Sequence, residues 1–510
     1  MPEPAWLADL GGAIDLTAVI PSGPDGPDRL TTELRRAGVG TALARHRDAL
    51  LGDPDAGTRR ALAAAAASGG ALLPVAVVAP IRSGDPAEAV ARAATAGAVA
   101  FWLGTATWYA SPATPSAATD RLLRAVARTG RPLLVPLEHW GDATAIGERT
   151  AGLGIPVVLV GAHYTHITDD LAAAERWPHL HLESSRLAHF AAIETAVRRI
   201  GAERLLLGTG APDRPPAAPV NAILAATIPD DAKRAILGGN AARLLGLGPS
   251  RPGVLLRPAL DAAGAIDVHG HLAPMPWDVP DLDPAAFAAA QAARGVSITV
   301  ASSIEAIAAH APTGNAAAVS AVAREPRLRA YLVADARDLA ATRADLLRWG
   351  DAPGIVGVKV HCEWSGVATA APEMAALFAL LADHGRPVKI HVGGEGWEAG
   401  LRTLADRHPR LSIVAAHAGP GTPTLGMARV AAATHNVVLE LASSFASLPE
   451  VRAVVEVAGP ERILFGSDAP LLDPAFVLGT YAATGLLPAT HPGVFRETAA
   501  RLFGLTEIPR

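Results

Sequence analysis

Two histidines one residue apart, His269 and His271, end the run Ala-Ile-Asp-Val-His-Gly-His. On a β-strand, residues i and i+2 share one face, so both imidazoles would point the same way. Three further residues follow short aliphatic runs later in the chain: His391, His417 and Asp468. Imidazoles and carboxylates are ligands that suit Zn²⁺. A lone His-x-His motif is weak evidence, but five such residues at strand ends predict a divalent-metal site.

The strands and helices that must hold these side chains can be predicted from the pattern of the sequence. Short β-branched runs alternate with longer stretches rich in Ala, Leu and Arg, which is typical of repeated βα units around a parallel sheet. Eight strands in about 250 residues predict a (β/α)8 barrel, whose catalytic groups gather at the carboxyl ends of the strands. The strands expected in the second half are 265–269, 297–301, 328–334, 355–361, 387–392, 411–416, 436–441 and 462–467.

The first half repeats the second. Matching segments are 13–19 with 265–271, 129–136 with 384–391, 202–212 with 460–470, and 240–247 with 498–505. Strands are expected there at 75–78, 98–103, 132–137, 156–161, 179–183 and 204–208. The predicted fold class is therefore α/β, with two tandem (β/α)8 TIM-type barrels at residues 1–250 and 251–510. A linker rich in Gly and Pro, residues 246–264, joins them.

The repeat shows that the first half lacks the chemistry-bearing residues. In the order His269, His271, His391, His417 and Asp468, the matching residues are Thr17, Val19, Pro136, Gly161 and Gly210. None of these supplies an imidazole or a carboxylate. We therefore expect a degenerate first barrel without a catalytic metal, which supports the second barrel.

The motifs of the second half resemble those of the amidohydrolase superfamily, in particular the branch that includes aminocarboxymuconate-semialdehyde decarboxylase. They are Asp-Val-His269-Gly-His271, Gly-Val-Lys359-Val-His361, Pro-Val-Lys389-Ile-His391, Ala-Ala-His417-Ala-Gly and Phe-Gly-Ser-Asp468-Ala-Pro. The resemblance implies that the metal, Zn²⁺ first and Mn²⁺ as the alternative, is bound by His269, His271, His391 and Asp468. It also implies that His417 is a catalytic histidine.

The resemblance further implies a metal-dependent hydrolase acting on an amide or lactone bond of a small carboxylated molecule. A bound divalent cation lowers the pKa of its water towards 7. Asp468 would accept the water's proton, and His417 would stabilise the developing oxyanion. Two alternatives stay open: a non-oxidative decarboxylase of the same branch, which the ligand set does not separate from a hydrolase, and a non-catalytic binding or scaffold protein.

Lysine is scarce in this arginine-rich chain. Two of its three lysines, Lys359 and Lys389, lie two residues before His361 and His391. Unlike guanidinium, an amine can lose its proton or be carboxylated. Lys359 is therefore a candidate catalytic residue: a carboxylated bridge between two metals, as in some amidohydrolases, a contact to a substrate carboxylate, or a structural partner of Glu363. Lys389 lies deeper and is expected to be a buried supporting group.

Other residue types carry weaker predictions. The single cysteine, Cys362, excludes an internal disulfide and is expected to pack as a small hydrophobe. Glu183 and Glu440 occupy equivalent seventh-strand positions, which predicts a shared structural role. Surface or interface roles are expected for five histidines of the first half, and pocket-shaping or packing roles for three tryptophans of the second: His163, His166, His179, His181, His189, Trp277, Trp364 and Trp397.

The amino-acid composition limits the kinds of molecule that the protein is expected to bind. The net charge of −5 comes without a basic run that would suit nucleic acid. No apolar run approaches the roughly 20 residues of a membrane span, and the first residues do not resemble a signal peptide. We therefore expect a soluble, cytoplasmic protein that binds a small molecule. The two halves would form a fused, intrachain pseudo-dimer, with further homo-oligomerisation left open.

Overall fold

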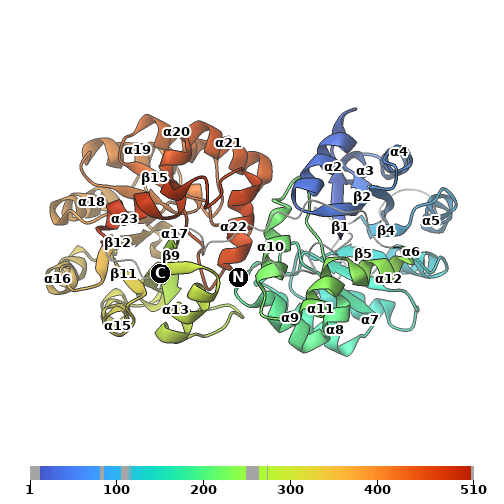
Figure 1. Ribbon diagram of the computed structural model, residues 1–510, viewed down its shortest axis with the longest axis horizontal. Helices are drawn as coiled ribbons and strands as arrows, with labels where there is room; N and C mark the ends of the chain where they lie inside the picture. The colour runs from blue at the N-terminus through green and yellow to red at the C-terminus, as the bar shows by residue number, and fades with distance from the viewer. Residues whose placement is uncertain are drawn as a thin grey trace. The chain divides into compact units, whose positions relative to one another are not determined.

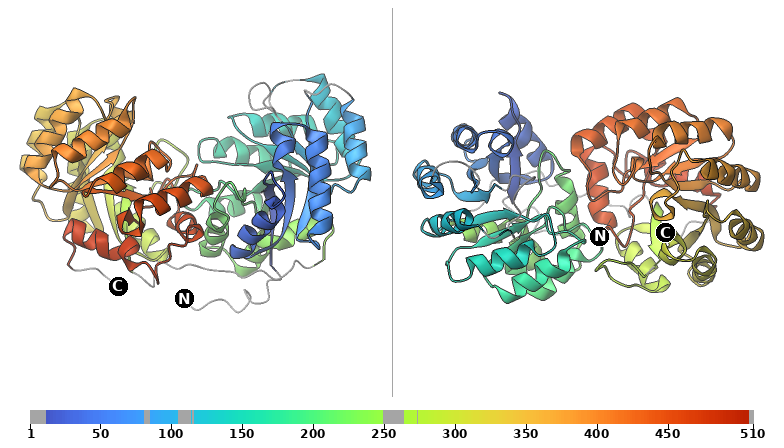
Figure 2. Two further views of the ribbon diagram at one scale, coloured as in Figure 1. Left: turned by 90° about the horizontal axis from the view of Figure 1, so that it is seen from above. Right: turned by 180° about the vertical axis from the view of Figure 1, so that it is seen from behind.

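The computed structural model describes residues 12–80, 85–104, 114, 116–248, 264–272 and 274–506. The chain divides into two compact units, Met1–Arg257 and Pro258–Arg510. The predicted domain boundary at residues 250 and 251 lies outside the described residues. In each unit, a ring of helices surrounds a set of strands (Figures 1 and 2).

Each unit contains eight parallel strands that pair in chain order. The first sheet comprises β1 (Ala13–Ile20), β2 (Val39–His46), β3 (Leu72–Val78), β4 (Ala100–Leu103), β5 (Leu133–Pro136), β6 (Val157–Val160), β7 (Leu180–Glu183) and β8 (Leu205–Leu206). The second comprises β9 (Ala265–Leu272), β10 (Val296–Ser303), β11 (Leu328–Val333), β12 (Ile355–His361), β13 (Val388–His391), β14 (Ile413–Ala415), β15 (Val437–Glu440) and β16 (Ile463–Leu464).

Backbone hydrogen bonds between the first and last strands close both sheets. The amide of Leu16 donates to Leu207 O at 3.0 Å, and the amide of Val268 donates to Phe465 O at 3.0 Å. Both units are therefore (β/α)8 barrels, which confirms the predicted fold class. Two strands of the first barrel were not in the list of expected strands. One is β1, which the repeat matches to 265–271. The other is β2, where Val39–His46 consists largely of Gly, Ala and other residues without a strong strand preference.

Helices separate successive strands. In the first barrel they are α2 (Gly26–Arg36), α3 (Arg47–Leu51), α4 (Pro54–Ala67), α5 (Pro86–Thr95), α6 (Ala117–Ala127), α7 (Asp142–Thr150), α8 (Ile167–Arg176), α9 (Ala192–Ile200), α10 (Ala217–Ala225), α11 (Asp230–Arg234) and α12 (Asn240–Leu245). In the second they are α13 (Pro284–Ala293), α14 (Ile304–Ala308), α15 (Ala311–Arg324), α16 (Leu339–Trp349), α17 (Cys362–Ser365), α18 (Pro372–His384), α19 (Trp397–Arg407), α20 (Leu425–Ala433), α21 (Leu448–Ala458), α22 (Pro474–Ala483) and α23 (Thr498–Phe503).

Short 3-10 and π turns complete the list: η1 (Ala202–Arg204), η2 (Ala235–Gly239), η3 (Ala416–Ala418), η4 (Pro460–Arg462) and η5 (Gly493–Glu497). Several helices begin at the dipeptide Asp-Pro, whose carboxylate accepts from free amides of the first turn while proline pre-sets the helical φ. The capping residues are Asp53, Asp85, Asp283 and Asp473.

The interiors of the two barrels differ towards their carboxyl ends. Apolar side chains fill the first barrel as far as Trp102 on β4 and Val160 on β6. The second barrel is apolar around Val268 and Tyr331, but then places two fully buried lysines, Lys359 and Lys389, across the interior. Uncompensated burial of charge is costly, so this polar layer marks the region where function should be sought.

Among the helices that the structure describes, none combines the length and the hydropathy needed to cross a lipid bilayer.

Candidate metal centre

The carboxyl end of β9 supplies two of the candidate ligands. His269 and His271 lie on the same face of the strand, and their side chains are buried inside the barrel. Nε2 of each imidazole lies near Oδ1 of Asp468, at 3.2 Å for His269 and 2.9 Å for His271. His269 and His271 on β9 therefore both contact Asp468, which follows β16, because the first and last strands of the barrel are neighbours.

Glu440, the last residue of β15, fixes the orientation of His269. Its Oε1 lies 2.8 Å from His269 Nδ1 and also accepts the amide of His417 at 2.7 Å. Since a carboxylate accepts, His269 carries its proton on Nδ1 and presents the Nε2 lone pair to the site. A carboxylate behind a histidine in this way is typical of metal ligands. The repeat had assigned Glu440 a structural role, but its contact with His269 could not be read from the strand pattern.

His417 lies in η3, directly after β14, with a left-handed backbone conformation at φ 60°. Its Nδ1 donates to the carbonyl oxygen of Ala442 at 2.7 Å, because a carbonyl can only accept. The ring lies 5.0 Å from the ring of His269 and 4.8 Å from that of His391, between centroids. Because Nδ1 is used by Ala442 O, Nε2 is the ring nitrogen of His417 that is left to act among the other imidazoles.

Asp468 follows β16 and also has a left-handed backbone, at φ 68°. Its amide donates to His269 O at 2.7 Å, which ties the loop to β9. Burial alone would raise the pKa of this carboxyl, but the hydrogen bond from His271 and the nearby His417 and Lys359 lower it to about 2. The carboxylate is therefore ionised at neutral pH and is available as a ligand or a proton acceptor.

His391 ends β13 and faces the same space. Its ring stacks on that of His361, the cross-strand neighbour on β12, with centroids 4.1 Å apart. His391 Nε2 is buried and has no hydrogen-bond partner among the described residues; Glu363 Oε2 lies 3.4 Å away without suitable alignment. Burial lowers the pKa of His391 to about 4, against the opposing effect of Glu363. A buried, unprotonated nitrogen of this kind has the chemistry of a metal ligand.

The two lysines form a cross-strand pair one pleat below the histidines. Lys359 Nζ lies 3.3 Å from His269 Nε2, and Lys389 Nζ lies 3.4 Å from Glu440 Oε1. Burial and the charge of Lys389 lower the pKa of Lys359 to about 7. Of the alternatives for Lys359, the pairing with Glu363 is wrong, because β12 ends at His361 and the α17 turn directs Glu363 towards His391 instead.

These residues together fit a divalent cation. Ligand atoms of His269, His417 and Asp468 all lie within 4.8 Å of one another. His271 contacts the same carboxylate oxygen, and His391 contributes the nitrogen that has no hydrogen bond. The group of three thus includes His417, for which a catalytic role was predicted, whereas the predicted ligands His271 and His391 lie beside it.

Comparison with known proteins places this site in a family. The sequence model of one family, described as amidohydrolase, matches residues 12–247 and again residues 266–505. The chain belongs to the amidohydrolase family. Both halves of the amidohydrolase match the same model, so the tandem duplication predicted from internal matches is confirmed. No curated protein sequence is significantly similar to the chain.

Solved structures similar to the amidohydrolase each cover about one of its barrels. A 5-carboxyvanillate decarboxylase from Sphingomonas paucimobilis is 17% identical, with 47% of this chain and 100% of that chain covered and a TM-score of 0.37. A 2,6-dihydroxybenzoate decarboxylase from Rhizobium is 17% identical, with 48% and 98% covered and a TM-score of 0.37. A dihydroxybenzoic acid decarboxylase from Polaromonas sp. JS666, solved with manganese and 2-nitroresorcinol, is 16% identical, with 48% and 98% covered and a TM-score of 0.38.

The remaining sequence candidates of the second barrel lie outside the cluster of ligand atoms. Cys362 is buried, its Sγ lies 3.4 Å from Thr369 Oγ1, and burial raises the pKa of its thiol, so it packs as a small neutral group as predicted. Trp364 is partly exposed on α17, with its ring perpendicular to that of His361. Trp397 begins α19, and Trp277 lies in the loop after β9.

Surface or interface roles were predicted for five histidines of the first barrel, and a surface position is wrong for three of them. His163, His166 and His189 are buried, and His179 and His181 are half-buried. His166 Nδ1 lies 2.7 Å from Asp170 Oδ2, and His179 Nε2 lies 2.8 Å from Thr150 Oγ1. Internal partners of this kind hold the imidazoles of His166 and His179, which a count of histidines along the chain could not show.

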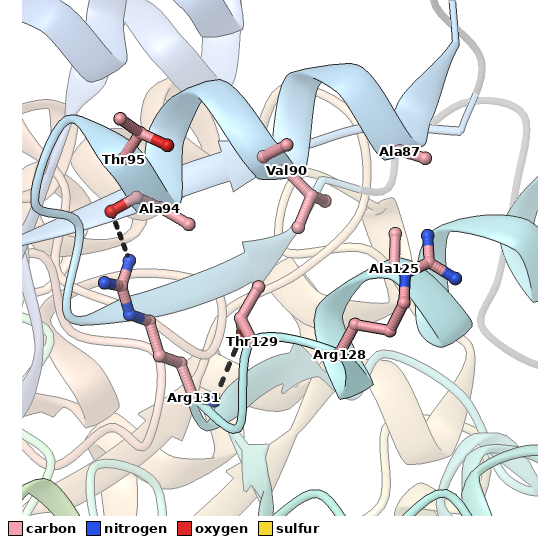
Figure 3. Close-up of a pocket in the computed structure, with 9 residues that line it drawn as sticks. Ala87, Val90, Ala94, Thr95, Ala125, Arg128, Thr129 and Arg131 are labelled. Carbon is pink, nitrogen blue, oxygen red and sulfur yellow. Dashed lines mark hydrogen bonds between the residues drawn. The ribbon is translucent and has the colours of Figure 1, made fainter.

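A groove on the outside of the first barrel contains none of the predicted site residues. It runs between α5 and α6 and is lined by alanines, Val90, two threonines and two arginines (Figure 3). The guanidinium of Arg131 crosses it to donate to Ala94 O at 2.8 Å. The groove is thus a packing feature between helices, remote from the carboxyl ends of the strands.

Proposed function

We propose that the second barrel of this amidohydrolase is a metal-dependent hydrolase that opens an amide or lactone bond of a small carboxylated molecule. The observation that carries the proposal is the group of buried ligand atoms of His269, His417 and Asp468, which lie within 4.8 Å of one another. His271 contacts the Asp468 carboxylate at 2.9 Å, and the ring of His391 lies 4.8 Å from that of His417. His269, His271, His391 and Asp468 would hold the cation. When bound, a divalent cation supplies Lewis-acid chemistry and activates water at neutral pH.

The chain's own residues would divide the remaining work. Asp468 is ionised and lies beside the nitrogens of two imidazoles, so it would accept a proton from the attacking water and return it to the leaving group. His417, held through Nδ1 by Ala442 O, would direct Nε2 at the substrate carbonyl and stabilise its developing negative charge once protonated. Glu440 would position both histidines through His269 Nδ1 and the His417 amide.

Lys359 lies one pleat deeper in the barrel than the histidines, where it would contact the substrate or become carboxylated. Its Nζ contacts His269 Nε2, and its lowered pKa makes the neutral amine accessible near neutral pH. A neutral amine can accept carbon dioxide to form a carbamate, and a protonated one attracts a substrate carboxylate. Lys359 is fully buried, which is what lowers its pKa most.

The test combines metal analysis with product analysis on the full chain. We expect about one tightly bound Zn²⁺ or Mn²⁺ per site and, in a screen of small carboxylated amides and lactones run in ¹⁸O-labelled water, one labelled carboxylate per bond opened. His269→Ala should lose both metal and activity, whereas His435→Ala, at an exposed position outside the site, should keep both.

Two results would contradict the proposal. Release of carbon dioxide from a carboxylated substrate without incorporation of ¹⁸O would identify a decarboxylase. A folded chain that retains no divalent metal and turns over no compound would indicate a binding or scaffold protein.

A further inference from the structure

In the first barrel, arginine side chains lie where the second barrel has two of its candidate ligands. Gly161 occupies the position of His417, and Arg186 Cδ lies 3.7 Å from the point where a Cβ on Gly161 would be. Gly210 occupies the position of Asp468, and Arg214 Cδ lies 2.9 Å from the corresponding point. The stem of Arg214 thus takes space that a side chain at Gly210 would need, and the stem of Arg186 borders the place of a side chain at Gly161 at van der Waals distance.

A third arginine, Arg45, lies at the carboxyl end of β2 in the same barrel. Arg45 is only 9% exposed, and its Nη1 donates to Thr17 O at 2.9 Å. Its guanidinium lies 3.5 Å above the ring of Trp102, a cation–π contact that holds it flat. The buried Nε of Arg45 has no hydrogen-bond partner within the part of the chain that the structure describes. A nine-tenths buried guanidinium with a free donor is therefore held at the end of β2.

The three guanidinium groups act on common neighbours. The charges of Arg186 and Arg214 repel each other, and both add to the effect of burial in lowering the pKa of His163 to about 2. Glu183, at the end of β7, interacts electrostatically with Arg45, Arg186 and Arg214 alike. The three guanidinium groups therefore share one buried carboxylate as an electrostatic neighbour.

Glu183 is largely occupied by other donors. Its Oε1 accepts the amide of Gly161 and the hydroxyl of Ser185, each at 2.7 Å, and its Oε2 accepts the amide of Ser185 at 2.7 Å. Asp15, the other buried carboxylate nearby, accepts the amide and hydroxyl of Thr209 at 2.8 and 2.7 Å. Asp213 forms an ion pair with Arg47. Glu183, Asp15 and Asp213 thus also hold backbone amides, Thr209 or Arg47.

We propose that the cluster of Arg45, Arg186 and Arg214 binds the oxyanion, carboxylate or phosphate, of a small molecule, so that the first barrel is a ligand-binding domain. Guanidinium forks bind both anions with paired hydrogen bonds. Loops after the seventh and eighth strands, which carry Arg186 and Arg214, are also where (β/α)8 barrels frequently build phosphate sites. The proposal is independent of the reaction assigned to the second barrel.

The test is calorimetric titration of the full chain with inorganic phosphate and, separately, with malonate, after metal has been removed and the chelator dialysed away. We expect one saturable site, and the tighter of the two anions identifies the class of ligand. Arg214→Met and Arg45→Met, which keep much of the apolar stem, should each weaken binding about tenfold to a hundredfold. Arg214→Lys should fall between, and Arg59→Met, an exposed position on α4, should bind like the parent.

Three outcomes would overturn the proposal: neither anion binds, the Arg45 and Arg214 variants titrate like the parent, or binding is lost in Asp468→Asn and not in the arginine variants. The last would place the anion site in the second barrel. Circular dichroism melting checks each variant for folding. If Arg45→Met does not fold, Arg214→Met and Arg214→Lys decide the question, because Arg214 lies in a loop.

Discussion

The two barrels follow the same backbone path at the ends of their sixth and eighth strands, but they place different residues on it. In the second barrel, His417 and Asp468 hold left-handed conformations at φ 60° and 68°. The first barrel has Gly161 at φ 90° and Gly210 at φ 66° in the same places. A side chain in this region costs about 1–2 kcal/mol, and glycine does not incur that cost. The strained path is thus a property of the fold, and only the second barrel bears side chains on it.

Buried carboxylates explain why the first barrel keeps this backbone conformation although it lacks the candidate metal ligands. Asp15 and Asp267 each accept amides from their own strand and from the loop after the last strand. Glu183 accepts the amide of Gly161, and Glu440 accepts that of His417, in the same way. Since these four acids hold the frame in both barrels, the first barrel could lose its imidazoles without losing its fold.

The largest expected effect comes from removing the charge that distinguishes Asp468 from Gly210. In Asp468→Asn we expect tight metal binding to be lost and turnover of the substrate found by the screen to fall by about 10²–10⁴-fold, because the proton acceptor is gone. Metal analysis and steady-state kinetics measure the two effects.

The controls for this change lie in both barrels. Asp351→Asn, whose side chain is 98% exposed, should behave like the parent. Gly210→Asp should gain no metal, because Arg214 occupies the space beside it. A fully active Asp468→Asn enzyme would show that the difference between the barrels lies elsewhere.

An intermediate effect should separate the two seventh-strand glutamates. Both hold backbone amides, but only Glu440 also contacts a candidate ligand, His269. Glu440→Gln should weaken metal binding about 10–100-fold, whereas Glu183→Gln should leave metal binding unchanged. Both should lower the free energy of unfolding by about 1–3 kcal/mol, since buried amides lose a charged acceptor. Metal titration and denaturant unfolding measure these effects; equal loss of metal affinity in both variants would remove the distinction.

The smallest effect tests the backbone directly. Gly210→Ala should lower the free energy of unfolding by about 1–2 kcal/mol, because a Cβ is disfavoured at this φ and would also press on Arg214. Gly130→Ala, at φ 66° with open space around it, isolates the backbone cost and should lower stability less. Equal losses in urea unfolding would show that the contact with Arg214 carries no energy.

Much of the fold was accessible from the sequence because it depends on local patterns. The eight strands of the second barrel and the tandem repeat followed from alternation of aliphatic runs and from letter-by-letter matches. The strand β2 was missed because its composition carries little strand preference, and pairing with β1 and β3 determines its conformation. The burial of His163 and His189 was missed for a similar reason: long-range packing decides it.

The sequence by itself determined which residue types stand at the ends of the strands, and hence that one barrel has the donors for a metal and the other does not. Tertiary structure alone decided how those donors are used. Glu440 contacts His269 across 171 positions of the chain, Asp468 reaches His271 across 197, and Arg186 and Arg214 lie over glycines in the first barrel. Spacing along a strand fixes which face a side chain takes, but only closure of the barrel brings distant strand ends within hydrogen-bond range.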